Sequence, residues 1–262
     1  MDYMAIVYAA VILSGIGIVF SAALGYADKK FSVEVDDRVA KVREALAGAN
    51  CGACGYAGCD AFADALVSGK AKVSDCPVSK SANVAKALGV KNEEQKPKVA
   101  RVLCQGTTDA AKPRYAYDGI KSCRVAAGIA GGPKQCRFSC LGLGDCEAKC
   151  KFGAIEMRDG IAYIDEEKCT GCTLCVAECP RNIIEMVPRD STVIVRCKNT
   201  DSGKLARAVC SKACIACLRC VKACKYDAIK VENNLARIDY EKCTRCGECA
   251  AVCPTKCITI EG

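Results

Sequence analysis

Two stretches of sequence decide the fold: CTGCTLCVAECP at residues 169–180 and CTRCGECAAVCP at residues 243–254. Both follow the cysteine spacing C-x2-C-x2-C-x3-C-P. In this spacing three thiolates hold one [4Fe-4S] cluster, and the fourth cysteine reaches across to a neighbouring cluster. Such a run rarely arises by chance. Its occurrence twice in one chain indicates a protein built around iron–sulfur clusters.

Each of these runs is preceded by a second cysteine run. CIACLRCVKACK at residues 214–225 keeps the spacing but ends in lysine instead of proline, and CRFSCLGLGDCEAKC at residues 136–150 is less regular. A shift of 74 residues places Cys150 on Cys224 and brings the two proline-ended runs into register. We therefore interpret this part of the chain as an internal repeat.

The repeat predicts two tandem bacterial-type ferredoxin modules with two clusters each. The first occupies residues 101–190 and carries an insertion, and the second occupies residues 191–262. Short apolar runs on both sides of residues 158–160 and of residues 233–234 predict a hairpin in each module. The fold class predicted for the whole chain is α+β.

The ligands of these four clusters follow from the cross-over rule, with one irregular position. Leu143 stands where the second unit has Cys217, and we expect Cys136 to fill that gap. The predicted ligands are Cys136, Cys140, Cys146, Cys150, Cys169, Cys172, Cys175, Cys179, Cys214, Cys217, Cys220, Cys224, Cys243, Cys246, Cys249 and Cys253.

Five cysteines then have no ligand role: Cys104, Cys123, Cys197, Cys210 and Cys257. The 74-residue shift aligns Cys123 with Cys197. Buried free thiols are the favoured interpretation, because cysteine is among the most buried residue types. Structural crosslinks and a labile metal site are the alternatives.

The N-terminal region predicts a membrane anchor at residues 1–28. Residues 4–27 contain no charged side chain and are long enough to span a bilayer as one helix. A cleaved signal peptide would need a basic residue before the apolar stretch. Instead, Lys29 and Lys30 follow it, which predicts a single span with the rest of the chain on the cytoplasmic side.

Residues 32–90 predict a small, α-rich domain with a fifth [4Fe-4S] cluster. CGACGYAGC at residues 51–59 and the later Cys76 supply four thiolates, so the predicted ligands are Cys51, Cys54, Cys59 and Cys76. Helices are expected around residues 36–47, 60–66 and 81–88. A zinc knuckle is the alternative for this site. The polar residues 91–100 predict a linker.

Composition limits the other functions that the chain could have. There are 25 cysteines and no histidine, and the formal charge is +8. Each oxidised cluster with four thiolates carries about −2, so five would contribute about −10 and leave the loaded protein near neutrality. We therefore do not expect nucleic-acid binding. No G-x-G-x-x-G motif opens a helix after a strand, and no complete active site is expected on this chain. Outer-sphere electron transfer is the predicted reaction.

The order of these segments resembles the B subunit of the Rnf complex. The resemblance depends on the anchor, on residues 51–59 with their distant Cys76, and on the tandem ferredoxin modules, and it covers essentially the whole chain. It implies a subunit of an ion-translocating (Na⁺ or H⁺) ferredoxin:NAD⁺ oxidoreductase of the inner membrane. Such a subunit would accept electrons from reduced ferredoxin and relay them to membrane partners. Flavin and NAD chemistry would lie on other subunits.

Three other functions remain open at this point. A membrane reductase that keeps a redox-sensing transcription regulator reduced would share every motif. A structural zinc protein would use the same cysteine pairs. A subunit of a corrinoid or carbon-monoxide system would share the motif at residues 51–76, although it would not explain the anchor and the paired modules.

Overall fold

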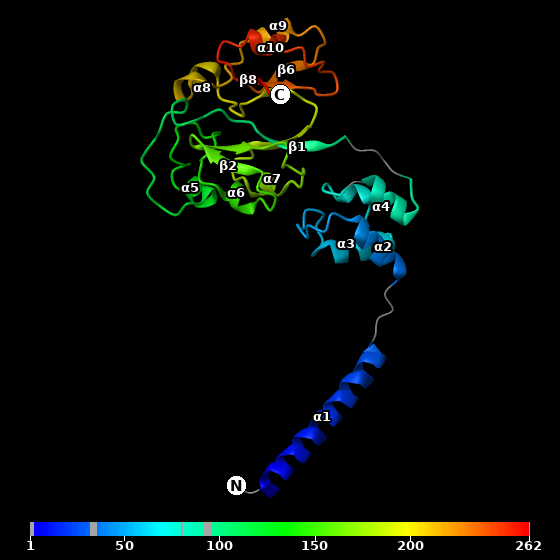
Figure 1. Cartoon of the computed structure of the whole chain (residues 1–262). Helices are drawn as coiled ribbons and strands as arrows, with labels where there is room; N and C mark the ends of the chain where they lie inside the picture. Colours follow the sequence, from blue (N-terminus) through cyan, green and yellow to red (C-terminus); the bar gives the residue numbers. More distant parts are fainter. Residues whose placement is uncertain (1–2, 32–35, 80, 92–95, 262) are drawn as a thin grey trace.

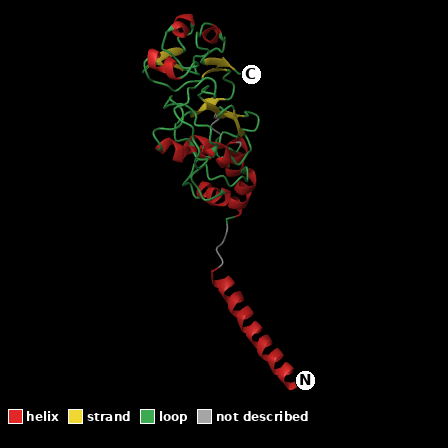
Figure 2. Ribbon diagram, turned by 90° about the vertical axis from the view of Figure 1, so that its left-hand side faces the viewer, coloured by secondary structure: helices red, strands yellow, loops and turns green. Residues whose placement is uncertain are grey.

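The computed structural model describes residues 3–31, 36–79, 81–91 and 96–261. Helices and strands follow the predicted order: one long N-terminal helix, a small helical domain, and two modules of short helices and two-stranded sheets. Among the described residues, all the strands lie in the two modules (Figures 1 and 2). This confirms the α+β fold class. Residues 32–35 and 92–95, which the predicted domain and linker include, lie outside the described residues.

The N-terminal helix, α1, runs over Tyr3–Phe31. Its 29 residues correspond to about 43 Å at 1.5 Å per residue, which exceeds the roughly 30 Å hydrocarbon thickness of a bilayer. The segment Val11–Lys30 has a mean hydropathy of 1.7, and none of it is buried inside the structure. Apolar side chains such as Leu13 and Phe20 are exposed along this helix.

The helical domain consists of α2 (Asp37–Ala45), α3 (Cys59–Val67), the short 3₁₀ helix η1 (Val73–Asp75) and α4 (Ser81–Leu88). The side chain of Asp36 caps α2 by accepting a hydrogen bond from the Arg38 N–H. Val42, Phe62 and Val84, one from each α-helix, are almost completely buried together. This small core holds the loop of residues 51–58 against the three helices.

The first module is closed by a sheet between its two ends. Strand β1 (Lys98–Val102) pairs antiparallel with β4 (Ile184–Pro188). Between them lies the predicted hairpin of β2 (Ile155–Arg158) and β3 (Ile161–Ile164), together with α5 (Cys123–Gly128), α6 (Asp145–Lys149) and α7 (Leu174–Glu178).

The second module repeats this plan. Strand β5 (Val193–Val195) pairs antiparallel with β8 (Ile258–Ile260) and closes the module. The hairpin of β6 (Ile229–Glu232) and β7 (Leu235–Ile238) lies between them, with α8 (Gly203–Val209), α9 (Arg219–Ala223) and α10 (Glu248–Ala251). The predicted duplication is therefore visible in the three-dimensional structure.

The structure corrects one part of the sequence alignment. Cys104 follows the end of β1 by two residues, and Cys197 follows the end of β5 by two residues. Cys197 therefore corresponds to Cys104, and the predicted match with Cys123 is wrong. A constant shift could not reveal this, because 32 residues separate Cys104 from Cys136 but only 13 separate Cys197 from Cys210. The extra residues of the first module include α5.

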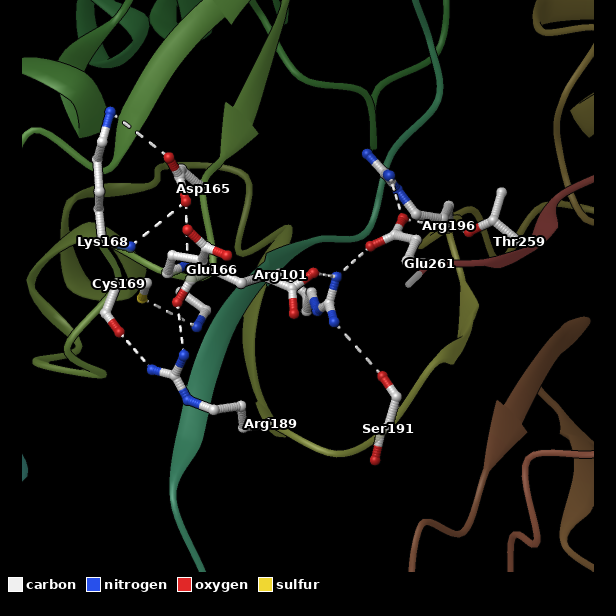
Figure 3. A network of polar contacts seen from close by, with 12 residues as sticks. Arg101, Asp165, Glu166, Lys168, Cys169, Arg189, Ser191, Arg196, Thr259 and Glu261 are labelled. Carbon is white, nitrogen blue, oxygen red and sulfur yellow. Dashed lines mark hydrogen bonds and ion pairs between the residues drawn. The ribbon is translucent and has the colours of Figure 1, made fainter.

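A buried ionic network joins the two modules. Arg101 on β1 forms ion pairs with Glu166 and with Glu261, which follows β8, and Arg196 pairs with the same Glu261 (Figure 3). Arg101 is only 5% exposed, and its guanidinium also donates to the carbonyl of Ser191 at 3.4 Å. Because a buried arginine is costly without its partner carboxylates, this network favours one arrangement of the modules.

Candidate metal centres

The second module brings each of its two predicted four-thiol sets onto one pocket. The first pocket, of about 320 Å³, is lined by Cys214, Cys217, Cys220 and Cys253, with Cys257 as a fifth cysteine beside them. The second, of about 310 Å³, is lined by Cys224, Cys243, Cys246 and Cys249. In both cases three cysteines come from one run and the fourth from the other. These are the two sets that the cross-over rule predicts.

The backbone conformation explains how one short run can surround a pocket. Leu218 and Arg245, each in the middle of a run, have φ angles of 59° and 65°. Thr173 in the first module has φ 67°. Side chains rarely adopt this left-handed conformation, which costs about 1–3 kcal/mol per residue and persists where the surroundings determine it. Its recurrence inside the cysteine runs indicates a chain that is bent around a bound group.

One pocket of the first module has the predicted composition. Cys150, Cys169, Cys172 and Cys175 line a pocket of about 330 Å³. The Ala154 N–H donates to the Cys150 sulfur at 3.4 Å, and the Ala100 N–H donates to the Cys169 sulfur at 3.5 Å. Amide donors of this kind stabilise the negative charge of cluster thiolates.

The other pocket of the first module differs from the prediction. Cys140, Cys146 and Cys179 line a pocket of about 340 Å³, and the fourth thiol there is Cys123. The structure does not bring Cys136 into this set. The expectation that Cys136 fills the gap left by Leu143 is therefore replaced by an assignment to Cys123.

The insertion of the first module explains why Cys123 reaches this pocket. Cys123 is the first residue of α5, and the carboxylate of Asp145 accepts hydrogen bonds from the Ser122 hydroxyl and from the Arg124 N–H, both at 3.0 Å. Asp145 is also the first residue of α6, directly before Cys146. One carboxylate thus joins the starts of both helices. The sequence signal was an insertion with one additional cysteine in the module that lacks one.

Cys136 lines a different pocket, of about 300 Å³. The other three thiols there are Cys104, Cys197 and Cys210, all of which the sequence left without a role. The fifth such cysteine, Cys257, is buried beside Cys253, with 3.7 Å between the two sulfur atoms. All 25 cysteines are described, and none forms a disulfide.

Three of the four predicted ligands of the helical domain pack against its core. Cys54, Cys59 and Cys76 pack against the cluster of Val42 and Phe62, and Cys51 is next to them in sequence. The Asn50 side chain accepts a hydrogen bond from the Cys59 N–H at 2.8 Å. The Ser79 N–H donates to the Cys76 sulfur at 3.4 Å.

Gly58 permits this arrangement. Its φ is 139°, and a Cβ there would lie 3.2 Å from the Asn50 side-chain oxygen. Another residue at this position would therefore disturb the hydrogen bond that holds the Cys59 N–H.

The grouping of the thiols favours a cluster over a single metal ion. A tetrahedral zinc site with Zn–S bonds of about 2.3 Å brings its thiolates within roughly 4 Å of one another. Among the described residues, no three cysteine, aspartate or glutamate side chains converge in a way that would hold one ion. A [4Fe-4S] cluster binds each thiolate through a different iron and so holds four sulfurs around a larger volume. The four-thiol pockets have the ligand number that a [4Fe-4S] cluster needs.

Burial keeps several of the ligand thiols protonated until a metal binds. Loss of solvation, together with neighbouring thiols, raises the pKa of Cys146 and of Cys175 to about 12. Burial likewise raises the pKa of Cys220 and Cys249 to about 11. Ligation by iron must therefore displace protons from these sulfurs.

Family models match three segments of the chain. A model of an Fe-S cluster domain matches residues 46–78. The model described as "4Fe-4S binding domain" matches residues 162–185 and 236–259. Cys104, Cys123, Cys136, Cys197 and Cys210 lie outside all three segments.

Three relatives, all of them B subunits, are similar to nearly the whole chain. That of the Na⁺-translocating ferredoxin:NAD⁺ oxidoreductase complex of Acetobacterium woodii is 49% identical over 95% of this chain and 76% of its own length. That of the ion-translocating oxidoreductase complex of Methanosarcina acetivorans is 38% identical over 95% of this chain and 96% of its own length. That of the proton-translocating ferredoxin:NAD⁺ oxidoreductase complex of Clostridium ljungdahlii is 40% identical over 95% of this chain and 90% of its own length.

Proposed function

Because the chain belongs to the B subunits of ion-translocating ferredoxin:NAD⁺ oxidoreductase complexes, we propose that it accepts electrons from reduced ferredoxin and relays them to the membrane subunits of such a complex. The family and the 4Fe-4S domains make it an electron-transfer subunit of an ion-translocating oxidoreductase. The donor, the number of centres and the path of the electrons are the proposed part.

The gathering of cysteines into separate four-thiol sets is the observation that carries this proposal. Four sets that line common pockets match centres that the sequence predicted, with Cys123 in place of Cys136, and three of the four predicted ligands of the fifth centre pack together in the helical domain. Bound [4Fe-4S] clusters would supply one-electron carriers at these places. The chain itself supplies thiolates, burial and amide donors, and these control the reduction potential of each centre.

Contacts between the domains suggest the order of the centres. Lys151, next to the ligand Cys150, donates a hydrogen bond to the carbonyl of Asn50 at 3.0 Å, and Asn50 precedes the ligand Cys51. The Cys51 thiol also adds to the rise in the pKa of Cys172, which burial causes in the main. The centre of the helical domain is thus the neighbour of the centre of Cys150 and Cys172.

The surface exposure of some ligands suggests where electrons enter or leave. Cys217 and Cys246 in the second module are exposed, whereas Cys140 and Cys146 in the first module are buried. Electron transfer between proteins needs a short path from a centre to the partner. We therefore place a partner contact on the second module.

We also propose that α1 anchors the chain in the inner membrane as a single span, with the soluble part on the cytoplasmic side. The apolar segment Val11–Lys30 and the unburied side chains of α1 support this placement. The basic residues Lys29 and Lys30 in the last turn agree with a cytoplasmic end there. The other subunits of the complex are the expected partners in the membrane.

A redox titration of the anaerobically purified full-length chain tests the proposed relay. Reduced ferredoxin, added in substoichiometric steps, should reduce the chain and produce the low-temperature EPR signals of reduced [4Fe-4S] centres. The matched control is a Cys51→Ala/Cys54→Ala variant, which should keep the centres of both modules. A chain with full cluster content that reduced ferredoxin does not reduce would contradict the proposed donor.

A further inference from the structure

One four-thiol pocket is assigned to nothing by the family models or by the ferredoxin pattern. It is lined by Cys104 and Cys136 from the first module and by Cys197 and Cys210 from the second. All four side chains are buried, with exposures of 6, 6, 9 and 7% respectively. The pocket measures about 300 Å³, close to the 310–340 Å³ of the four ferredoxin pockets.

The two modules contribute equivalent thiols to this pocket. Cys104 follows β1 and Cys197 follows β5, each by two residues. Each sulfur accepts a hydrogen bond from the N–H two residues later, Gly106 at 3.2 Å in the first module and Asn199 at 3.4 Å in the second. Cys136 and Cys210 are related by the 74-residue repeat. The pocket therefore has approximate two-fold symmetry, with two ligands from each half.

Hydrogen bonds connect this pocket to a ferredoxin centre on each side. The N–H of Cys140, a ligand in the first module, donates to the Cys104 sulfur at 3.3 Å. The N–H of Cys214, a ligand in the second module, donates to the Cys197 sulfur at 3.3 Å. Together with the bonds from Gly106 and Asn199, the sulfurs of Cys104 and Cys197 therefore each accept two amide hydrogen bonds. This is the pattern expected of thiolates that ligate a cluster.

A buried cation beside the pocket indicates that it holds an anion. Lys134 is only 9% exposed, and its ammonium donates to the carbonyls of Gly106 at 2.6 Å and Gly160 at 2.8 Å. Both partners are neutral. A buried ammonium without a counter-ion is costly, whereas a four-thiolate cluster of charge about −2 would supply that counter-ion.

We propose that Cys104, Cys136, Cys197 and Cys210 bind a sixth [4Fe-4S] cluster, shared by the two modules. Its role as a carrier rests on the proposed relay, in which it would connect the Cys140 centre with the Cys214 centre. Two contacts beside the pocket join the modules: Ala111 and Cys210 form a β-bridge, and Arg137 forms an ion pair with Asp201 at 2.9 Å. The site thus lies inside the module interface, where water has little access.

Iron and sulfide counting, together with native mass spectrometry of the anaerobically reconstituted full-length chain, tests this site. Six centres predict about 24 iron atoms per chain, four for each centre. The double variant Cys104→Ala/Cys210→Ala, which removes one ligand from each module, should hold about 20. The matched control is Cys257→Ala, because Cys257 is a buried cysteine outside the proposed ligand sets, and it should keep about 24.

If the double variant does not fold, the iron content of the wild-type chain alone tests the sixth centre. Five centres use 20 of the 25 cysteines, and the remaining five contain only one set of four that lines a common pocket. A wild-type chain with about 20 iron atoms, or with zinc in place of the additional four, would overturn the sixth centre. This result is independent of the electron donor, so a chain that holds six clusters but is not reduced by ferredoxin would refute only the proposed relay.

Discussion

Replacing Leu143 with cysteine should rescue the centre that Cys123→Ala damages. Leu143 occupies the position of Cys217 in the repeat. The residues on both sides have the same left-handed conformation in the two modules: φ is 76° at Gly142 and 87° at Gly144, against 53° and 59° at the matching positions of the second module. A cysteine at position 143 should therefore point at the cluster as Cys217 does.

The size of the effect follows from the ligand count. Cys123→Ala leaves Cys140, Cys146 and Cys179 on the pocket, so one iron loses its thiolate. We expect a loss of between about one and four iron atoms per chain, depending on whether the centre decays to [3Fe-4S] or is lost completely. The double variant Cys123→Ala/Leu143→Cys should return to the wild-type content, because it restores the regular spacing of the second module.

Iron and sulfide analysis of anaerobically purified protein measures the content, and EPR of the oxidised sample detects a [3Fe-4S] centre. Cys136→Ala is the matched control: it should also lose iron, but from the shared pocket, so Leu143→Cys should not rescue it. The reasoning would be refuted if Leu143→Cys restored iron to the Cys136→Ala variant and not to the Cys123→Ala variant. That outcome would return Cys136 to the Cys140 centre.

Three further predictions concern the interface, the unpaired cysteine and the protonation of the ligands. Glu261→Gln leaves the buried Arg101 and the half-buried Arg196 short of a carboxylate. Because Glu261 is 22% exposed, we expect the free energy of unfolding to fall by roughly 2–4 kcal/mol, slightly less than for a fully buried pair. Anaerobic unfolding by denaturant measures this change, and Asp36→Asn, which removes a carboxylate from an exposed ion pair, is the control. Cys257→Ala removes a thiol that contacts the Cys253 sulfur at 3.7 Å. Iron content should be unchanged because Cys257 is not a proposed ligand, but the reduction potential of the Cys214 centre should fall because a hydrogen bond to a ligand sulfur is lost. An unchanged potential in an EPR titration would show that the contact has no influence. Burial raises the pKa of Cys146 and Cys175 from 9.0 to about 12, so the metal-free fold should be stable below pH 9.0 and lose stability as the pH rises toward 12, which circular dichroism measures. Cluster assembly needs deprotonated thiols, so the rate of iron incorporation should increase as the pH rises toward 9.0. A rate that falls over that range would contradict the assignment of these thiols as ligands.

Local spacing was sufficient to predict most of the fold, because cluster ligation dictates both spacing and conformation. The run at residues 243–254 specifies three ligands of one centre and the fourth of another, and the structure brings those cysteines together. The turns at Asp159 and Asn234, with φ of 47° and 61°, lie where the apolar pattern predicted hairpins. These features depend on residues close together in sequence.

The roles of Cys104, Cys123 and Cys197 were not predictable in the same way. Their pockets depend on the sheets β1–β4 and β5–β8, which pair the beginning of each module with its end. The insertion between Cys104 and Cys136 also shifts the register of the repeat, so a constant shift aligns Cys123 with the wrong partner. Only the paired strands show which cysteines are equivalent, and that information is not present in the spacing of one run.

The shared pocket gives a physical reason for the duplication. One module alone would present only two of these thiols, Cys104 and Cys136 or Cys197 and Cys210, which is half of the ligand set that a cubane needs. The same edge of the first module carries the buried Lys134, whose ammonium has no carboxylate partner among the described residues and would gain a counter-ion from a bound cluster. Bringing two copies together completes the ligand set and buries it at the interface, and it does so next to Cys140 and Cys214, the nearest ligands of the flanking centres. Two modules joined in this way form one continuous series of centres, whereas two modules joined by a flexible linker would each be isolated from the other.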